Sequence, residues 1–267
     1  MKDYQEIATG LRRDVIQMLH RANGSFGGSA MSCIDLIAVL YHGVLRVDPQ
    51  NPYDPGRDMF FLSKGHASSA LYAALASVGM IDQEALQAYA MNDTRMTIHP
   101  KLNAFPGVEA STGALGHGLA LGTGSALAAR IMKRDANVFV LMGDGECNEG
   151  AVWENAAFAA SQNLSNLVLI VDRNGLQGCG RDVVNYGDIG EKFRAFGFQV
   201  VNIDGHDHAE IEAALKKAIS IESSRPSAII AKTIKGCGIS YMEDKLEWHY
   251  KSPNHEQLQQ ALEELKK

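Results

Sequence analysis

An aspartate between two glycines follows directly on an apolar segment of the sequence. Residues 137–142 read NVFVLM, a run typical of a strand buried on both faces of a parallel sheet, and GDG follows at 143–145. In open α/β sheets, ligands bind beyond the carboxyl ends of the strands. Asp144 and a phosphate would repel each other, but a divalent cation such as Mg²⁺ bridges protein oxygens and phosphates. The segment predicts a phosphate and metal site, served by the N-terminus of a helix that begins near Glu149.

A second polar turn follows the next apolar segment. Residues 166–172 read NLVLIVD and run into RNG, so that Asn174 lies at the neighbouring carboxyl end. Its amide oxygen and a backbone carbonyl of that loop are suitable second and third ligands for the cation. Either motif alone is as readily explained as a tight turn. Two such turns after adjacent strands favour the metal site.

Apolar, β-rich segments recur along the chain and alternate with helical ones. The predicted strands occupy 59–63, 137–142, 166–172, 198–203 and 227–233, and Ala-rich helices are predicted over 115–134 and 149–162. This alternation requires βαβ crossovers and predicts an α/β fold with a doubly wound, mostly parallel sheet. We treat residues 1–267 as a single domain of this kind.

Capping residues locate two further helices. Asp207 and Asn254 are each followed three residues later by Glu or Gln, which predicts a capping box at both positions. The first helix should run to about residue 222, and the second should be the C-terminal helix. Segments 91–113 and 234–253 show little periodicity and are predicted to be long loops, which usually carry function in a compact domain.

The composition is that of an ordinary globular protein. Of the 267 residues, 46% are hydrophobic and 21% are charged. The formal net charge of −6 argues against a nucleic-acid partner and a membrane-surface role, and no apolar run approaches the ~18 residues that a membrane span needs. The four cysteines are scattered without a CxxC pair, so we expect reduced thiols in a cytoplasmic protein rather than a disulfide frame or a zinc site.

Four separated segments resemble those of transketolases, in the order in which that family has them. GDGECNEG followed by VDRNG is similar to the thiamine diphosphate motif, a GDG with an Asn some two dozen or more residues later. The others are FLSKGHASSALYA (61–73), HPKLNAFPGVEASTGALGHGLA (99–120) and KTIKGCGISYMEDKLEWHYKSPN (232–254). The sequence ends where a full-length transketolase continues into its pyrimidine-binding and C-terminal domains. It is therefore similar to the N-terminal subunit of split transketolases.

The resemblance implies a site for thiamine diphosphate and Mg²⁺. It assigns the metal to Asp144, Asn174 and the backbone of Leu176. It assigns the diphosphate to His66 and Gly145, and the aminopyrimidine to backbone groups of Gly113 and Leu115. The implied cofactor-binding set is His66, Gly113, Leu115, Gly143, Asp144, Gly145, Glu146, Asn174, Leu176 and His249.

Three histidines are the catalytic residues that the resemblance implies. His66 would lie on the diphosphate, His99 would reach substrate hydroxyls, and His249 would lie between diphosphate and substrate. Imidazoles suit proton transfer because they titrate near neutrality. Each residue also has a plainer interpretation: His66 as a helix cap, His99 as an exposed loop residue, and His249 as a core or interface residue.

The sequence departs from the family's pattern at three positions. Phe26 stands where many transketolases have a substrate-contacting His, and Tyr250 replaces the Gly that usually follows the catalytic-loop His. His117 replaces a common Gln. Phe26 and Tyr250 form the predicted substrate pocket together with His99 and His249, so these two changes bear on which sugar the pocket accepts.

The resemblance also implies an activity and a partner. The reaction would transfer a two-carbon glycolaldehyde unit from an anionic ketose to an aldose. The glutamate that activates the aminopyrimidine in this family lies in its other half, so a separate C-terminal subunit would be needed, with two copies of each chain. Glu149 and Glu154 match acidic positions at that interface between chains.

Two other functions stay open at the level of sequence. The first is the α-subunit of a 2-oxoacid dehydrogenase, which shares the fold and a GDG motif. The SKGHAS and EWH segments count against it. The second is a cofactor-binding regulatory subunit without catalytic activity. The intact metal ligands Asp144 and Asn174 count against that interpretation.

Overall fold

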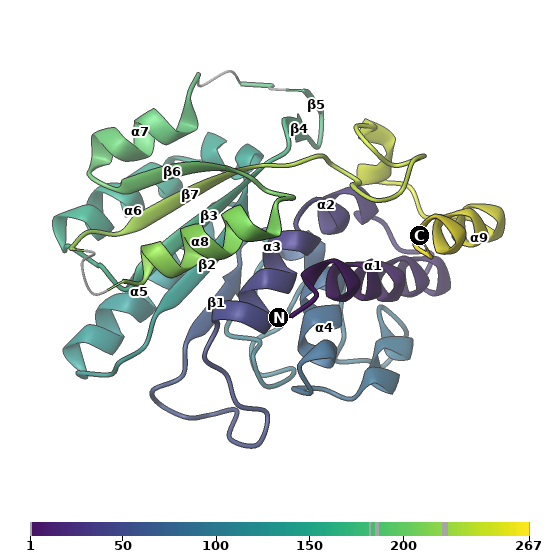
Figure 1. Cartoon of the computed structure of the whole chain (residues 1–267), viewed down its shortest axis with the longest axis horizontal. Coiled ribbons are helices and arrows are strands. Elements are labelled where there is room, and N and C mark those ends of the chain that lie inside the picture. Colours follow the sequence, from purple (N-terminus) through teal and green to yellow (C-terminus); the bar gives the residue numbers. More distant parts are fainter. Residues whose placement is uncertain (1, 182, 185–186, 221–223, 267) are drawn as a thin grey trace.

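A parallel sheet forms the centre of the molecule (Figure 1). The computed structural model describes residues 2–181, 183–184, 187–220 and 224–266. Within them, the order across the sheet is β1 (Met59–Leu62), β2 (Val138–Gly143), β3 (Leu167–Arg173), β7 (Ser227–Lys232) and β6 (Gln199–Asp204). Each neighbouring pair is parallel. All five strands were predicted from the sequence, and the α/β fold is confirmed.

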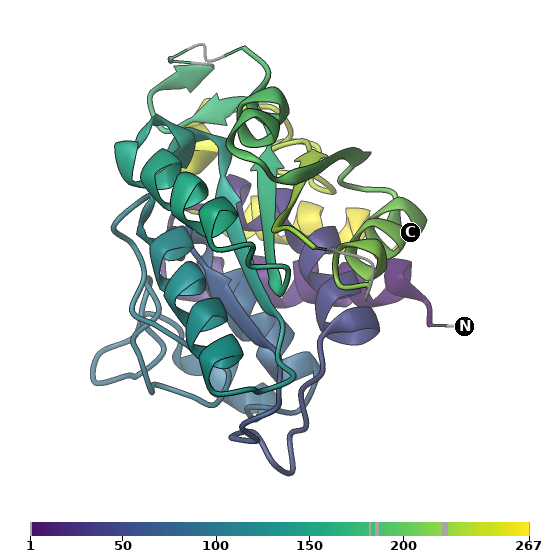
Figure 2. The same cartoon turned by 90° about the vertical axis from the view of Figure 1, so that its left-hand side faces the viewer.

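Helices cover both faces of the sheet, as a doubly wound fold requires. One face carries α5 (His117–Ile131), α6 (Gly150–Ser161) and α7 (Ile189–Phe196). The other carries α1 (Tyr4–Arg21), α2 (Gly27–Ser32), α3 (Ile34–Val39), α4 (Ser68–Ser77) and α8 (His208–Ala218), and α9 (His255–Glu264) packs against α1. Figure 2 shows α5 and α6 side by side on their face.

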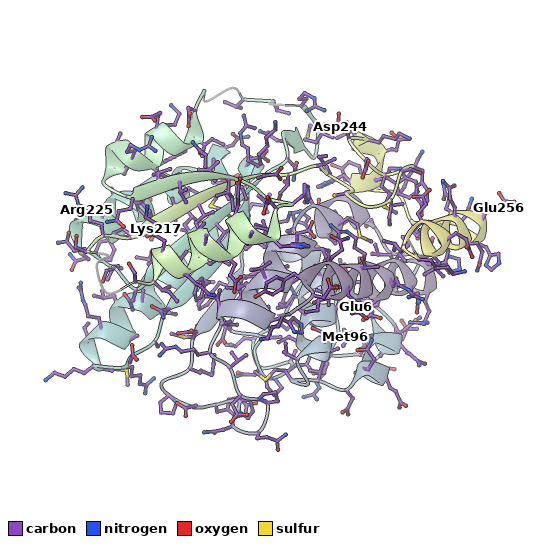
Figure 3. All side chains as sticks on the ribbon, in the orientation of Figure 1. Glu6, Met96, Lys217, Arg225, Asp244 and Glu256 are labelled. Carbon is purple, nitrogen blue, oxygen red and sulfur yellow. The ribbon has the colours of Figure 1, made fainter. Side chains whose placement is uncertain are left out.

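Alternate residues of each strand enter two different apolar cores. In β2, Phe139 and Leu141 pack into the core beneath α1 and α3, whereas Val138, Val140 and Met142 pack beneath α5 and α6. This two-sided burial explains why the strands are apolar throughout rather than alternating with polar residues. Charged residues such as Glu6, Lys217 and Glu256 lie on the outer faces of the helices (Figure 3).

The predicted helix caps are confirmed at Asn254 and only in part at Asp207. At Asn254 both halves of the capping box form. Asp207 accepts hydrogen bonds from the N–H groups of Ala209 and Glu210, but the carboxylate of Glu210 accepts from the N–H of Asp204 at 2.9 Å instead of returning to Asp207. The α8 helix ends at Ala218, short of the predicted end, and residues 221–223 lie outside the described part of the chain.

Short elements occupy the turns beyond the strands. The 3-10 helix η4 (Asp144–Asn148) follows β2 directly, and α6 begins after it at Gly150 with Glu149 as its N-cap, which confirms the helix predicted to begin near Glu149. After β3, β4 (Leu176–Gln177) and β5 (Gly180–Arg181) form an antiparallel hairpin. The predicted loop 91–113 has no helix or strand, and 234–253 holds only the 3-10 helix η5 (Leu246–His249).

None of the described helices combines the length and the apolar character that crossing a bilayer requires. The longest, α1, is amphipathic and buries one side, with Leu11, Val15 and Leu19 in the core.

Gly122 allows α5 to lie close to β2. A Cβ atom at this position would lie 2.2 Å from Cγ2 of Val140, whereas a Cβ at Gly124 in the same helix would meet nothing within 4 Å. We therefore expect Gly122→Ala to lower the free energy of unfolding by about 1–3 kcal/mol. Gly124→Ala should raise it by about 0.5–1 kcal/mol, the usual difference between Ala and Gly inside a helix. Urea denaturation of the two variants measures both values, and equal effects would contradict this packing.

Candidate functional site

A cavity of 470 Å³ opens at the carboxyl ends of β2 and β3. Its walls come from α2, the turn before α4, the 91–113 loop, η4, the β4–β5 hairpin and the 234–253 loop. Every residue predicted to bind cofactor, metal or substrate or to act in catalysis lines it: Phe26, His66, His99, Gly113, Leu115, Gly143, Asp144, Gly145, Glu146, Asn174, Leu176, His249 and Tyr250.

The register between β2 and β3 brings the predicted metal ligands together. Gly143 pairs with Asp172, so Asp144 and Asn174 follow at the same edge. Asp144 Oδ2 accepts the N–H of Gly175 at 2.6 Å, and burial raises the pKa of the Asp144 carboxyl. Asn174 Oδ1 accepts the N–H of Leu176 at 3.0 Å. A carboxylate, an amide oxygen and a backbone carbonyl are the donors that Mg²⁺ favours.

Two polar features of the cavity fit a cation and its anionic partner. The Nζ atom of Lys235 donates to the carbonyl of Leu176 at 2.8 Å, so a basic side chain already lies on the third predicted ligand. Burial and the nearby Lys64 lower the pKa of Lys235 to about 8. In addition, Oδ1 of Asn148, which lines the cavity, is buried without a hydrogen-bond partner in the described part of the chain. These residues fit a bound metal diphosphate.

A buried ion pair lies directly behind Asn174. Lys64 contacts Asp172, which is fully buried and also accepts hydrogen bonds from Ser32 at 2.5 Å and from Thr233. Burial raises the pKa of Asp172, but Lys64 and the hydrogen bonds from Ser32 and Thr233 together outweigh this effect, and the pKa is lowered overall. The Nδ2 atom of Asn174 lies 3.4 Å from the same carboxylate. Because a carboxylate only accepts, the amide nitrogen faces inward and Oδ1 faces away from the ion pair.

Neutral imidazoles form one wall of the cavity. Burial, Lys64 and His249 lower the pKa of His66 to about 2, and burial, Lys235 and Lys64 lower that of His249 to about 4. Burial also lowers the pKa of His99. All three rings are therefore uncharged near neutral pH. In that form each ring offers one N–H donor and one acceptor nitrogen.

Phe26 lies among these three histidines. Its ring centroid is 5.3 Å from those of His66 and His249 and 6.2 Å from that of His99. Phe26 has φ 70°, a left-handed conformation that is strained for a bulky residue and that often marks functional sites. Tyr250 is 62% exposed and donates its hydroxyl to the carbonyl of Gly178 at 3.0 Å. Neither ring is part of the apolar core.

Glu146 supports the GDG turn from behind. Its carboxylate accepts the N–H groups of Gly143 at 2.8 Å and Gly116 at 2.9 Å, and the hydroxyl of Ser63 at 2.5 Å. Burial raises the pKa of Glu146. The side chain thereby ties the end of β2 to Gly116, the residue that follows the cavity residue Leu115 and precedes α5.

The backbone at Gly113 passes close to His99. A Cβ atom at Gly113 would lie 2.8 Å from Cδ2 of His99, and its φ of 138° is rarely adopted by other residues. Leu115, two residues on, is 40% exposed at the cavity wall. A glycine is therefore required where the 91–113 loop meets the imidazole.

Several cavity residues were not predicted from the sequence. They are Ser29, Lys64, Asn148, Gln177, Gly178, Cys179, Val183 and Lys235. Lys64 and Lys235 carried a usable signal, because each is a basic residue next to glycine just beyond a strand. The predicted interface residues Glu149 and Glu154 do not line the cavity, and both are exposed.

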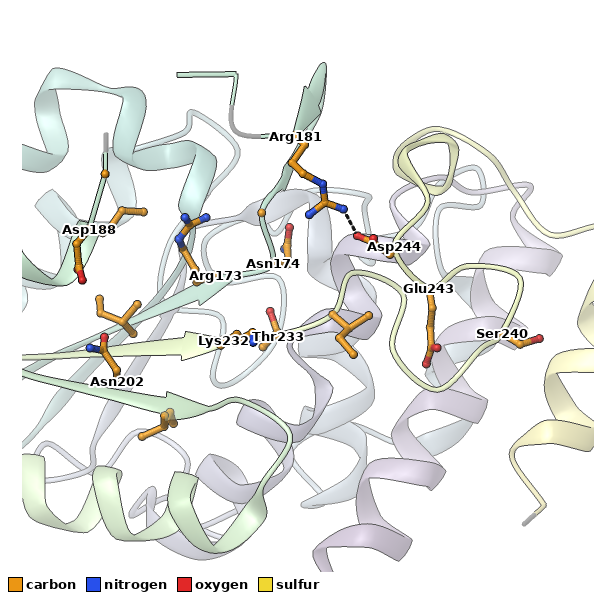
Figure 4. A pocket seen from close by; sticks show the side chains of 16 residues that line it. Arg173, Asn174, Arg181, Asp188, Asn202, Lys232, Thr233, Ser240, Glu243 and Asp244 are labelled. Carbon is orange, nitrogen blue, oxygen red and sulfur yellow. Dashed lines mark hydrogen bonds and ion pairs between the residues drawn. The ribbon is translucent and has the colours of Figure 1, made fainter. Parts of the chain in front are cut away.

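A larger cavity, of 950 Å³, lies on the other side of the β3 end. Figure 4 shows Arg173 and Asn174 at the end of β3, Lys232 at the end of β7, and the ion pair between Arg181 and Asp244. Only Asn174 among the predicted site residues lines this cavity. We place the candidate active site in the smaller cavity, where the histidines and all the predicted metal ligands meet.

Comparisons with known proteins show the family of this chain. The family model "Transketolase, thiamine diphosphate binding domain" matches residues 4–265. The A subunit of the apulose-4-phosphate transketolase of Actinobacillus succinogenes is 37% identical over 268 residues, 99% of this chain and 96% of that protein. The 6-deoxy-6-sulfo-D-fructose transketolase subunit SqwG of Clostridium sp. is 34% identical over 99% of this chain and 97% of its own length. The chain belongs to the transketolase family.

Solved structures show the same fold. The transketolase of Campylobacter jejuni superimposes with a TM-score of 0.93 at 32% identity, over 100% of this chain and 43% of that one. This chain thus corresponds to the thiamine diphosphate-binding part of a transketolase, and it is a transferase of the transketolase type.

Asp144 should destabilise the chain when no metal is bound. Its folded-state pKa is raised above the ordinary value of 3.8, so the charged form is disfavoured in the folded state, and this cost is present above that pKa and disappears as the pH falls below 3.8. In EDTA at pH 7, Asp144→Asn should raise the midpoint of thermal unfolding, on the order of 2–4 °C. The gain should shrink toward pH 3.

A matched control for this measurement is Glu154→Gln, which neutralises an exposed carboxylate on α6 and should leave the midpoint nearly unchanged. A parent chain more stable than Asp144→Asn at pH 7 would contradict the assignment of Asp144 as a buried, unfavourable charge.

Proposed function

We propose that the chain is the cofactor-binding subunit of a split transketolase, which transfers a two-carbon glycolaldehyde unit from a ketose to an aldose. One observation carries the proposal. The ligands Asp144, Asn174 and the Leu176 carbonyl share a single cavity with neutral imidazoles. The match to relatives that are named as transketolase subunits, over nearly their whole length, supports the division of the enzyme between two polypeptides.

The cavity residues divide between cofactor and substrate. We propose that Mg²⁺ binds to Asp144, Asn174 and the carbonyl of Leu176, and that His66 and the GDG turn bind the diphosphate of thiamine diphosphate. When bound, that cofactor supplies the electron sink needed to break a carbon–carbon bond beside a carbonyl. His99 and His249 are neutral and can each donate and accept a proton at a sugar hydroxyl.

The substrate we propose is a ketose with an anionic group. The relatives are named for apulose 4-phosphate and for 6-deoxy-6-sulfo-D-fructose, which are both ketoses with an anionic group. Phe26 adds a restriction of its own. It is close to three imidazoles but can form no hydrogen bond, so a substrate hydroxyl directed at it would lose a partner at a cost of about 1–3 kcal/mol.

The exposed faces of α5 and α6 support a partner chain. On α5 the exposed residues His117, Leu121, Gly124, Ala128 and Ile131 form a stripe that contains no Asp, Glu, Lys or Arg, and the exposed Arg130 lies outside this stripe. On α6, Phe158 is 45% exposed, and the predicted interface residue Glu154 shares its face. Obligate interfaces are more apolar than ordinary surface. We propose that a C-terminal transketolase subunit covers this side, with two copies of each chain.

Reconstitution tests the proposed function. The purified chain should fold but turn over no sugar, because part of its site would come from the partner. Addition of a transketolase C-terminal subunit encoded beside it, with thiamine diphosphate and Mg²⁺, should give ketol transfer and a complex with two copies of each chain by light scattering. Asp144→Asn should assemble but remain inactive. Ketol transfer by the chain alone would refute the proposal.

Phe26 should contribute to substrate choice. Phe26→His restores a hydrogen-bonding ring, and we expect it to raise kcat/KM for xylulose 5-phosphate relative to the preferred ketose by about tenfold, or about 1.4 kcal/mol. Assays of the reconstituted enzyme on a panel of ketose phosphates and sulfonates measure this ratio. Tyr250→Phe removes only the hydroxyl that binds Gly178 and serves as the control. A change of less than about threefold in Phe26→His means that Phe26 does not set specificity.

A further inference from the structure

A buried aspartate behind the active site collects four hydrogen-bond donors. Asp35 of α3 accepts two bonds from the guanidinium of Arg12, at 3.2 and 2.5 Å, and both residues are almost fully buried. His206 Nδ1 lies 2.7 Å from one carboxylate oxygen and His208 Nε2 lies 2.9 Å from the other. The two histidines thus make similar contacts with Asp35.

His206 differs from His208 because its second nitrogen binds the main chain. The N–H of Ile234 donates to His206 Nε2 at 2.9 Å. That bond requires a lone pair on Nε2, so the ring carries its proton on Nδ1 and donates it to Asp35. Burial lowers the pKa of His206, whereas its interactions with Asp35 and Cys237 raise it, with a net rise. The N–H of Ile234 opposes a second proton on the ring, because only a nitrogen without a proton can accept this bond. No such second bond to the described main chain is seen for His208.

Hydrogen bonds with two other segments hold the backbone of the turn that follows Ile234. The N–H of Gly236 donates to the carbonyl of Gly28 at 3.0 Å, and Arg12 Nε donates to the carbonyl of Cys237 at 3.1 Å. Asp35 therefore supports both ends of this turn indirectly. It binds His206, which accepts from Ile234, and Arg12, which donates to Cys237. Two residues lie between these anchors, Lys235 and Gly236.

The position of Lys235 depends closely on this turn. A Cβ atom at Gly28 would lie 3.1 Å from Cγ of Lys235, so the lysine stem passes tightly over α2. Its Nζ atom then reaches the Leu176 carbonyl at 2.8 Å and His249 Nδ1 at 3.0 Å. A small movement of the backbone at Ile234 would break both contacts.

The same cluster has the composition of a metal site. Ligand atoms of Asp35, His206 and Cys237 lie within 4.8 Å of one another. However, both oxygens of Asp35 and both nitrogens of His206 already take part in hydrogen bonds, and the Arg12 cation lies on the same carboxylate. These contacts favour a role in holding the turn over a role in binding a metal.

We infer that His206 is a positioning residue of the active site: Asp35 orients its ring, the ring fixes the main chain at Ile234, and the turn thereby sets Lys235 between Leu176 and His249. The hydrogen bonds of His206 and Lys235 support this placement of Lys235. Its consequence for cofactor binding rests on the proposed function.

The experiment compares His206→Phe with His208→Phe, which each keep a ring and remove one donor to Asp35. Only the first also removes the acceptor for Ile234. The readouts are the ¹⁵N shift of His249 Nδ1 in the full chain, assigned by its absence in His249→Gln, and the calorimetric affinity of the reconstituted complex for thiamine diphosphate with Mg²⁺. Lys235→Met shows the shift expected when the contact to His249 is lost.

His206→Phe should move the His249 signal in the same direction as Lys235→Met and weaken cofactor binding about tenfold, as loss of an outer-shell partner does. His208→Phe should leave the signal in place and the affinity within about twofold, although both variants lower the thermal midpoint. His206→Gln retains an acceptor and should restore the parent signal. If His206→Phe does not fold, His206→Met replaces it.

An unmoved His249 signal in His206→Phe, or an equal shift in His208→Phe, would overturn the inference. The ¹⁵N measurement needs no cofactor. If the parent complex fails to bind thiamine diphosphate, the proposed function fails, while the positioning role of His206 is still decided by the spectrum.

Discussion

The parallel register between β2 and β3 is the constraint on which the site depends. It sets Gly143 beside Asp172. Asp144 and Asn174, the first residues after β2 and β3, therefore present their oxygen atoms at the same edge of the sheet. Lys64, from the segment after β1, forms a buried ion pair with Asp172 and holds it in this position. Breaking a buried pair leaves an uncompensated charge, which costs about 3–5 kcal/mol. One ion pair thus links the ends of β1 and β3 and orients Asn174.

The same lysine shapes the chemistry of the cavity. Lys64 and Lys235 both act on His66 and His249, and their charges add to burial in keeping the two imidazoles neutral. A neutral imidazole can donate at one nitrogen and accept at the other, whereas an imidazolium can only donate. The basic residues that suit a diphosphate therefore also keep the neighbouring histidines ready to accept a proton.

Residues close in sequence to a strand end were predictable, whereas contacts across the fold were not. Asp144 and Asn174 were found because a parallel strand of known direction places the next residues at the ligand-binding edge. Lys235 also follows a strand end, but its role was missed because its contact with Leu176 spans 59 positions. Glu210 shows the same limit. Its spacing suited a capping box, but its carboxylate accepts instead from the N–H of Asp204 at the end of β6.

The site gathers features that oppose folding of the chain alone. Phe26 has a left-handed backbone, burial raises the pKa values of Asp144 and Glu146, and Asn148 Oδ1 is buried without a partner in the described structure. Each of these costs free energy in the isolated chain. A cation would offset the cost at Asp144, and a ligand or partner chain could offer a donor to Asn148. Because ligands that bind only the folded state stabilise it, cofactor and partner binding would recover part of this cost, so that formation of the site and assembly of the enzyme are energetically coupled.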